Sequence, residues 1–311
     1  MPLPEPDRPV LLRRAQAVAE GYTDAELARM VRRKKLSRLQ RGTYAEGSAV
    51  LPVDPAARHA LVVLATIAGL RSPAIVSHES AAVLHQLPVW GIRLGRVHIL
   101  RPPPARGTGS SRVHLHVAKV PDDQLVLAEG LLATDVTRTI VDVARTAPFE
   151  SAVVMADRAL HTRSTSRAAL EECLGLMGPV PGRRAAARVI AFADPLSESV
   201  GESRSRVLVH RLRLPVPDLQ VRVLRQDGSE IGRCDFGWKD RRTVGEFDGQ
   251  IKYGRLLRPG QSPGDVVFEE KLREDELRDH RWQVARWTWH DLDRGSVVEQ
   301  RIRRSFARGA G

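Results

Sequence analysis

The sequence predicts an α+β protein in three parts, at residues 1–50, 51–195 and 196–311. Three observations support this division. Near the N-terminus, a capped amphipathic helix precedes a short basic hairpin. The middle alternates apolar helical stretches with short strands, and the C-terminal part has a strand meander between charged helices. A chain of 311 residues is long enough to bury a core in each of two or three domains.

The charge of the chain favours a polyanionic partner. Lys and Arg number 49 against 37 Asp and Glu, which gives a net charge of +12 and a pI of about 10.6. Chains this basic most often bind nucleic acid. The two cysteines, Cys173 and Cys234, are too far apart for a ligand cluster or a disulfide framework, which suits a reducing cytoplasm. With no membrane-spanning run and no apolar signal core, we expect a soluble cytoplasmic protein without a membrane partner.

The first part has the layout of a winged helix-turn-helix. A helix is expected over residues 11–20, and Thr23 and Glu26 then form a capping box that opens a second helix. Residues 38–44 predict a short β-wing. This layout resembles the N-terminal domain of AbiEi-type antitoxins, in which Arg-Gly-x-Tyr closes the wing, here ending at Tyr44.

Six cations fall within ten residues of this part: Arg32, Arg33, Lys34, Lys35, Arg38 and Arg41. In a helix-turn-helix such side chains contact phosphates and some base edges. The alternative is a solvated basic face on a small helical domain. The resemblance implies double-stranded DNA as the partner, together with a toxin or a second copy of the chain.

The middle part predicts a mixed helix and strand segment. Helices are expected over residues 56–70, 79–87, 134–145, 152–161 and 168–177, and strands over 97–100 and 113–117. Residues 134–144 with Asp157 also resemble the segment that follows AbiEi-like winged helices, where it is a structural or interaction module. Five histidines lie here: His78, His85, His98, His114 and His116. Their spacing matches no zinc motif, so we expect no metal site among them.

The C-terminal part contains a predicted β-hairpin over residues 232–249. A turn that is symmetric about residues 240 and 241 pairs residues whose numbers sum to 481, which sets Asp235 opposite Glu246. Cys234, Phe236 and Phe247 then share the other face and point to a core. Two facing carboxylates repel each other, and a divalent cation such as Mg²⁺ would relieve that repulsion.

A plainer alternative makes these two acids solvated edge charges, each paired with an arginine such as Arg233 or Arg242. Around the hairpin we expect a helix over residues 202–213 and a preceding strand over 220–225. A charged helix over 266–280 and a strand over 283–289 that joins the sheet beside Glu246 should follow.

From Ser197 to about Gly295 the sequence resembles the PD-(D/E)XK nuclease superfamily, and within it the branch of very-short-patch repair endonucleases. The resemblance rests on Asp235, on Glu-x-Asp-Gly from Glu246, and on the flanking helices. It implies a restriction-endonuclease-like α/β domain with a central mixed sheet. It also implies that Asp235 and Glu246 bind Mg²⁺ or Mn²⁺, with Asp248 or Glu202 completing the shell.

The match departs from the superfamily pattern at one position. The pattern ends in Glu-x-Lys, whereas here the third residue is Asp248. Lys252 or Lys271 could take the place of the missing lysine and face the scissile phosphate. Glu202 has two interpretations of equal weight: the acid on the first helix of the nuclease fold, or the partner of Ser199 in a capping box.

Two functions follow from this sequence. The first is a Mg²⁺-dependent DNA endonuclease that the winged helix places on the duplex. The alternative is a non-catalytic DNA-binding regulator or antitoxin of a type IV toxin–antitoxin-like system, in which the nuclease fold is degenerate; the missing lysine motivates it.

Overall fold

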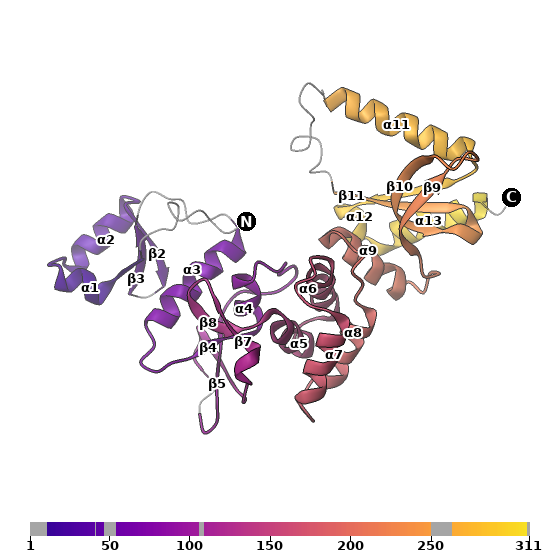
Figure 1. Ribbon diagram of the computed structural model, residues 1–311. Coiled ribbons are helices and arrows are strands. Elements are labelled where there is room, and N and C mark those ends of the chain that lie inside the picture. The colour runs from indigo at the N-terminus through magenta and orange to yellow at the C-terminus, as the bar shows by residue number, and fades with distance from the viewer. Residues whose placement is uncertain (1–10, 41, 47–53, 106–108, 250–262, 310–311) are drawn as a thin grey trace. The chain divides into compact units, whose positions relative to one another are not determined.

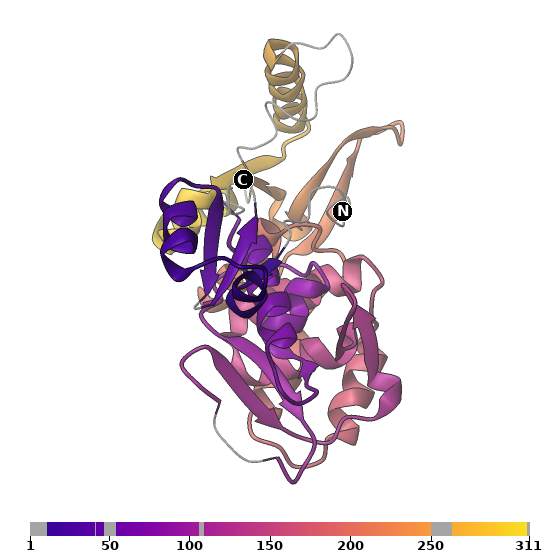
Figure 2. The same cartoon turned by 90° about the vertical axis from the view of Figure 1, so that its left-hand side faces the viewer.

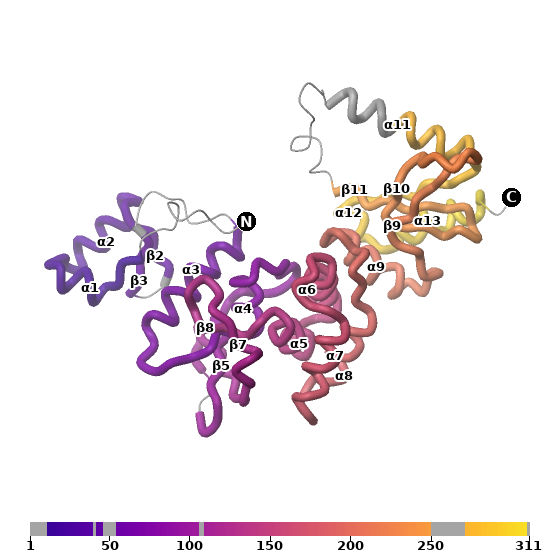
Figure 3. Tube along the Cα trace, in the orientation of Figure 1, coloured from indigo at the N-terminus to yellow at the C-terminus, as the bar shows by residue number. Residues whose placement is uncertain are grey.

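The structure is a computed structural model that describes residues 11–40, 42–46, 54–105, 109–249 and 263–309. By internal contacts the chain forms two compact units, Met1–Ser151 with Thr165–Arg188 and Ala152–Ser164 with Val189–Gly311. Figure 3 follows the backbone through both of them. The predicted α+β class is confirmed, with sheets of three, four and five strands. The boundaries of the three predicted domains stay a prediction. No helix among the described residues is both long and apolar enough to cross a membrane.

The N-terminal elements form a three-stranded sheet with two helices on one side (Figures 1 and 2). In chain order they are β1 (Leu11–Arg13), α1 (Arg14–Ala19), α2 (Asp24–Arg32), β2 (Leu36–Gln40) and β3 (Thr43–Glu46). The antiparallel strands are ordered β1-β3-β2, and β2 with β3 is the predicted wing.

Two sequence expectations can be compared with these elements. The capping box at α2 is confirmed: the Thr23 side chain accepts a hydrogen bond from the Glu26 amide, and the Glu26 carboxylate accepts one from the Thr23 amide. The helix predicted over residues 11–20 is wrong in its first three residues. These form β1 because Leu12 pairs with Tyr44 of β3 and buries in the same small core as Leu27.

The middle of the chain folds around a five-stranded sheet of order β6-β5-β4-β8-β7. Its strands are β4 (Ile75–Val76), β5 (Val97–Arg101), β6 (Val113–Val117), β7 (Leu125–Ala128) and β8 (Leu131–Thr134), and its helices are α3 (Pro55–Ala68), α4 (His78–Leu84), α5 (Val136–Thr146) and α7 (Arg167–Leu176). Val76, Val97 and Ile99 pack with Val63 of α3 and Leu84 of α4 in one apolar cluster. The two strands and the helices predicted here are present, while the β7–β8 hairpin is an addition that the sequence patterns missed.

The second unit contains a four-stranded sheet of order β12-β11-β10-β9. Its elements are α9 (Val200–Arg211), β9 (Asp218–Leu224), β10 (Glu230–Trp238), β11 (Thr243–Asp248), α11 (Pro263–Asp279), β12 (Gln283–Thr288), α12 (Trp289–Asp293) and α13 (Gly295–Gly309); helices α6 (Phe149–His161) and α8 (Arg183–Phe192) each extend from one unit into the other. The meander β9–β10–β11 is antiparallel and β12 pairs with β11 in parallel, as predicted.

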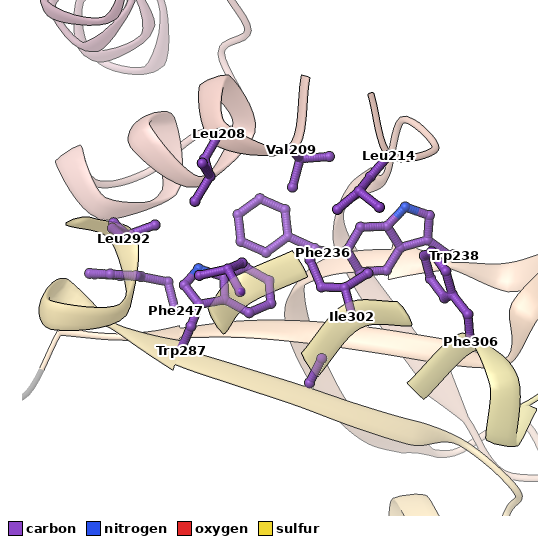
Figure 4. Packing of buried hydrophobic residues seen from close by; sticks show 12 residues of the cluster. Leu208, Val209, Leu214, Phe236, Trp238, Phe247, Trp287, Leu292, Ile302 and Phe306 are labelled. Carbon is purple, nitrogen blue, oxygen red and sulfur yellow. The ribbon is translucent and has the colours of Figure 1, made fainter. Parts of the chain in front are cut away.

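Apolar clusters cover the two faces of this sheet, one under α9 and one under α11 (Figure 1). Figure 4 shows Phe236, Phe247 and Trp287 packed under Leu208 and Val209 of α9. On the other face, Cys234 and Val244 pack against Leu277 of α11.

The prediction that Cys234 shares a face with Phe236 and Phe247 is therefore wrong, because Cys234 packs in the cluster under α11 and the other two pack in the cluster under α9. Regular pairing of β10 with β11 ends at the pair of Phe236 and Gly245. Pairing of β10 with β9 continues through Cys234 and Val221, but the pair of Asp235 and Gln220 is missing from that ladder and Gln220 has a positive φ of 51°. The alternation of faces therefore breaks between Cys234 and Phe236.

Candidate functional site

The basic segment lies at the end of α2 and runs into the wing. We use this name for Arg32, Arg33, Lys34, Lys35 and Arg38, whose side chains are all exposed. Arg32 is the last residue of α2, the next three occupy the turn, and Arg38 lies on β2. The sixth predicted cation, Arg41, lies outside the described residues.

The basic segment and the first turn of α2 carry opposite charge. Within the described residues, none of the five cations forms an ion pair, whereas Arg14 makes a bidentate pair with Asp24 at 2.6 and 2.7 Å. Hydrogen bonds from Arg14 lower the pKa of Asp24, and those from Thr23 lower the pKa of Glu26, so both acids stay ionised. Free cations at the helix end and wing suit phosphate contacts, while an acidic first turn does not attract the duplex.

The hairpin register in the second unit agrees with the sequence. Phe236 pairs with Gly245, and 236 + 245 = 481, the predicted sum. Asp235 follows where this pairing ends, and its carboxylate accepts a hydrogen bond of 2.8 Å from the Phe247 amide. That carboxylate oxygen therefore bonds the backbone of the neighbouring strand.

Glu246 is held by two arginines on the face covered by α11. Its side chain is only 11% exposed, and its two oxygens lie 2.7 Å from Arg273 of α11 and 2.7 Å from Arg286 of β12. Arg286 is the partner of Glu246 in the parallel register. Cys234 lies beside this site: burial and then the charge of Glu246 raise the pKa of its thiol to about 12.

This arrangement differs from both interpretations of Glu246 made from the sequence. The acid is paired with arginines, but it is buried and its partners are not those proposed. Arg233 instead pairs with Glu198 at 2.8 Å, and Arg242 adopts a left-handed conformation after the turn. The parallel register of β12 could have identified Arg286 once that strand was placed beside Glu246. Arg273 depends on how α11 packs, which no local pattern specifies.

Glu202 lies near the start of α9 and acts in capping. The Ser199 side chain accepts from the Glu202 amide at 3.2 Å, and the Ser199 hydroxyl donates to the Glu202 carboxylate at 2.6 Å. The other carboxylate oxygen accepts from the Glu198 amide and from Gln220, each at 2.9 Å. Three donors thus occupy the carboxylate, and a metal ion would have to replace some of them.

The remaining predicted site residues lie apart. Lys252 lies outside the described residues, and Lys271 is exposed on α11. Asp248 is half-buried at the end of β11, in register with Thr288. Among the described acids, histidines and cysteines, the only three whose ligand atoms converge are His78, His98 and His116, in the middle sheet.

This histidine group is the set that the spacing argument dismissed. Burial lowers the pKa of His116 to about 3 and holds the pKa of His78 well below the usual value. Both rings are therefore neutral at physiological pH. The three residues meet because β6, β5 and β4 are neighbours in the sheet. The spacing of histidines along the chain does not reveal which strands are neighbours.

Comparison with known proteins assigns the N-terminal part. The family described as transcriptional regulator, AbiEi antitoxin matches residues 5–47, which confirms the resemblance predicted there. Two relatives from Mycobacterium tuberculosis, Uncharacterized protein Rv2248 (strain H37Rv) and Uncharacterized protein MT2308 (strain CDC 1551), are each 30% identical over 190 residues. The match covers 61% of this chain and 63% of theirs, so the chain spans less than two thirds of these curated relatives.

A solved structure, the RV2827C protein from Mycobacterium tuberculosis, is similar at 19% identity with a TM-score of 0.38. It covers 59% of this chain and 72% of that chain. Likeness at this level supports no inference about function.

Proposed function

We propose that this chain is a DNA-binding transcriptional regulator of the antitoxin type, with its N-terminal winged helix on duplex DNA. The observation that carries the proposal is the basic segment, a run of exposed cations without ion pairs, inside the region that matches AbiEi-type regulators. Such cations displace counterions from DNA and add affinity that falls with salt. The net charge of +12 adds long-range attraction to the duplex.

The salt dependence of binding tests this role. If the segment neutralises about four phosphates, log K should fall against log salt with a slope of about −3.6, at −0.9 per contact. Replacing Arg32, Arg33 and Arg38 by Ala should flatten that slope by about 2.7. Fluorescence anisotropy with labelled duplex DNA, at salt concentrations from about 50 to about 200 mM, measures the slope for the wild type and for the triple variant.

The matched control removes the same charge elsewhere in the same unit. Arg71, Arg93 and Arg184 are exposed and lie outside the winged helix, so their triple Ala variant should keep the slope of the wild type. Equal slopes for the wild type and the Arg32/Arg33/Arg38 variant would contradict the proposal, because they would mean that the basic segment is a solvated face that does not contact DNA. An antitoxin role also implies a toxin or a second copy as partner, and co-purification with the product of a neighbouring toxin-like gene checks this.

A Mg²⁺- or Mn²⁺-dependent endonuclease is the second candidate. It is favoured by the strand order of the C-terminal sheet, in which the strand of Asp235, β10, lies beside the strand of Glu246, β11. In this proposal the two acids bind the metal, Asp248 or Glu202 completes its shell, and Lys252 or Lys271 faces the phosphate. The arginines on Glu246 weigh against it, because a metal must displace them.

Plasmid nicking decides between the two candidates. An active nuclease should nick supercoiled plasmid with Mg²⁺ or Mn²⁺ and lose this activity in Asp235→Ala protein. The regulator proposal expects equal, background nicking for both proteins. Nicking that survives in Asp235→Ala protein excludes this site as its source.

A further inference from the structure

We propose that His78, His98 and His116 bind one divalent transition-metal ion, with Zn²⁺ as the first choice. Glu79 is not one of the three converging residues, and we add it as the fourth ligand because its Oε2 lies 2.8 Å from His98 Nδ1. The three residues are 20 and 18 positions apart (98 − 78 and 116 − 98). Their ligand nitrogens nevertheless all lie within 4.8 Å of one another. Imidazole nitrogens suit Zn²⁺ and its neighbours in the first row, and three histidines with one carboxylate make a complete tetrahedral set.

The middle sheet explains why these residues meet. Strands β6, β5 and β4 are neighbours in that order. His116 lies on β6, His98 lies on β5, and His78 begins α4 two residues after the end of β4. The ring of His78 stacks on that of His116, with centroids 3.5 Å apart. The site therefore joins three neighbouring elements, although His98 is in register with His114 and His116 with Leu100, so that His98 and His116 meet diagonally.

The distances fit a shared ion. His98 Nδ1 is 3.1 Å from His116 Nε2 and 2.8 Å from Glu79 Oε2. Ligand atoms bound to one tetrahedral Zn²⁺ at about 2.0–2.1 Å are about 3.3 Å apart. These two separations are slightly shorter, and the His78 nitrogen lies within 4.8 Å of the other two. Because a Zn–N bond lies in the plane of its ring, the stacked rings of His78 and His116 must also turn out of parallel to admit the ion.

Hydrogen bonding alone leaves this cluster incomplete. A ring nitrogen carries at most one proton, so His98 Nδ1 can donate to His116 or to Glu79 but not to both. Glu79 Oε2 is buried and has His98 Nδ1 as its ion-pair partner at 2.8 Å, although the geometry there is not that of a hydrogen bond. When His98 donates to His116, this oxygen lacks a donor among the described residues, and a cation at this point would satisfy it together with the nitrogens.

The surrounding charges do not exclude a cation. Arg138 and Arg145 are the positive groups that act on His78. Both are paired with the buried carboxylate of Asp142, at 2.9 and 3.0 Å. His114, the remaining ring of the cluster, stacks on His116 with centroids 4.3 Å apart but is not among the three converging residues.

An ion held in this way would fasten the edge strand β6 and the start of α4 to β5. The backbone of His78 has φ +50°, a left-handed conformation that costs energy in a residue other than glycine. Ligation would hold that conformation in place. The role that follows is structural, because the four ligands leave no open position for a substrate.

The test uses the untagged full-length chain, stripped with a chelator and dialysed. Inductively coupled plasma mass spectrometry after Zn²⁺ loading should find one equivalent, and Co²⁺ loading should give the visible absorption of a tetrahedral site. Two variants on β6 replace histidine by phenylalanine and so keep an aromatic ring. His116→Phe removes a proposed ligand, whereas His114→Phe removes a histidine that is not a proposed ligand. We expect His116→Phe protein to lose the bound metal and His114→Phe protein to keep it.

Glu79→Gln keeps the shape of the side chain and tests the same site independently, in case the His116→Phe variant does not fold. It should weaken Zn²⁺ binding about 10- to 100-fold, a loss typical of removing one supporting group of a metal site. Circular dichroism confirms that each variant is folded. Absence of a stoichiometric metal in the wild type, or equal binding by wild type, His116→Phe and Glu79→Gln proteins, would overturn the proposal.

Discussion

The basic segment and the Glu246 site hold the same kind of side chain in opposite electrostatic states. Arg32, Arg33 and Arg38 are exposed and have no ion pair within the described residues. Arg273 and Arg286 are each about 30% exposed and both are bound to the nearly buried carboxylate of Glu246. Composition counts all five arginines equally, although only the first three are available to an outside anion.

The difference indicates which charges act in recognition and which act in folding. An arginine that already neutralises a buried acid must break that pair before it contacts a phosphate, and the buried acid would then be left uncompensated. An unpaired surface arginine has no such cost. This contrast is why the basic segment, and not the carboxylate site, carries the proposed function.

The largest expected effect comes from Glu246→Gln, which removes the charge that holds Arg273 and Arg286. Removing one partner of a buried ion pair costs about 3–5 kcal/mol, and we expect a loss of about 3 kcal/mol because both arginines are partly exposed. Urea denaturation followed by tryptophan fluorescence reports on this unit, since Trp287 and Trp238 lie in its core.

Glu230→Gln is the matched control in the same sheet. Its partner Arg222 is 69% exposed, so this pair should contribute no more than about 1 kcal/mol. A metal site made of Asp235 and Glu246 predicts the opposite result for Glu246→Gln in metal-free protein, because the substitution would then relieve repulsion between two carboxylates. Stabilisation of that variant would contradict the ion-pair account.

A smaller effect is expected from Asp24→Asn at the first turn of α2. This change removes the acid that binds Arg14, so it adds a free arginine to the winged helix and deletes a negative charge. DNA binding should tighten several-fold, and the salt slope should steepen by about 0.9 if Arg14 gains one phosphate. Anisotropy at several salt concentrations measures both quantities.

The control for this prediction is Asp123→Asn, an exposed acid of the same unit that lies outside the winged helix. It removes the same charge and should change affinity only slightly through the long-range field. If both variants bind DNA alike, the first turn of α2 does not face the duplex.

Local patterns were enough to predict much of the fold. The Thr23 capping box, the wing and the β9–β10–β11 meander depend on neighbours in sequence or on a short connection. The parallel β12 follows from the strand–helix–strand order of β11, α11 and β12. The patterns were wrong where a distant contact decided the structure. Residues 11–13 became a strand because Tyr44 offers a partner. Cys234 changed faces because the ladder between β9 and β10 is irregular at Asp235 and Gln220, where Gln220 has a positive φ.

The candidate sites were predictable to a lesser degree. The hairpin register with the sum 481 followed from the symmetry of the turn, but the arginines on Glu246 depended on the packing of β12 and α11. The histidines show the same limit. His98 and His116 converge through the pairing of β5 with β6, and spacing along the chain contains no record of which strands are neighbours.

The smallest effect concerns the rigidity of the helix that leads into the basic segment. Thr23 closes the first turn of α2 by accepting a hydrogen bond of 3.2 Å from the Glu26 amide. Thr23→Ala should cost about 1 kcal/mol of local stability, and amide hydrogen exchange in α2 should quicken about five-fold. Thr23→Ser keeps the acceptor and should exchange like the wild type.

The pH dependence of the difference in amide exchange between the wild type and Thr23→Ala shows whether the charge of Glu26 contributes to it. Hydrogen bonds from Thr23 lower the folded-state pKa of Glu26, so its stabilising contribution is present above its unfolded pKa and disappears as the pH falls through the folded value. After correction for intrinsic exchange rates, the gap between wild type and Thr23→Ala should therefore narrow below about pH 4. A gap that stays constant down to pH 2 would mean that the hydroxyl stabilises α2 without help from the Glu26 charge, and the reciprocal capping box would then be a geometric feature only.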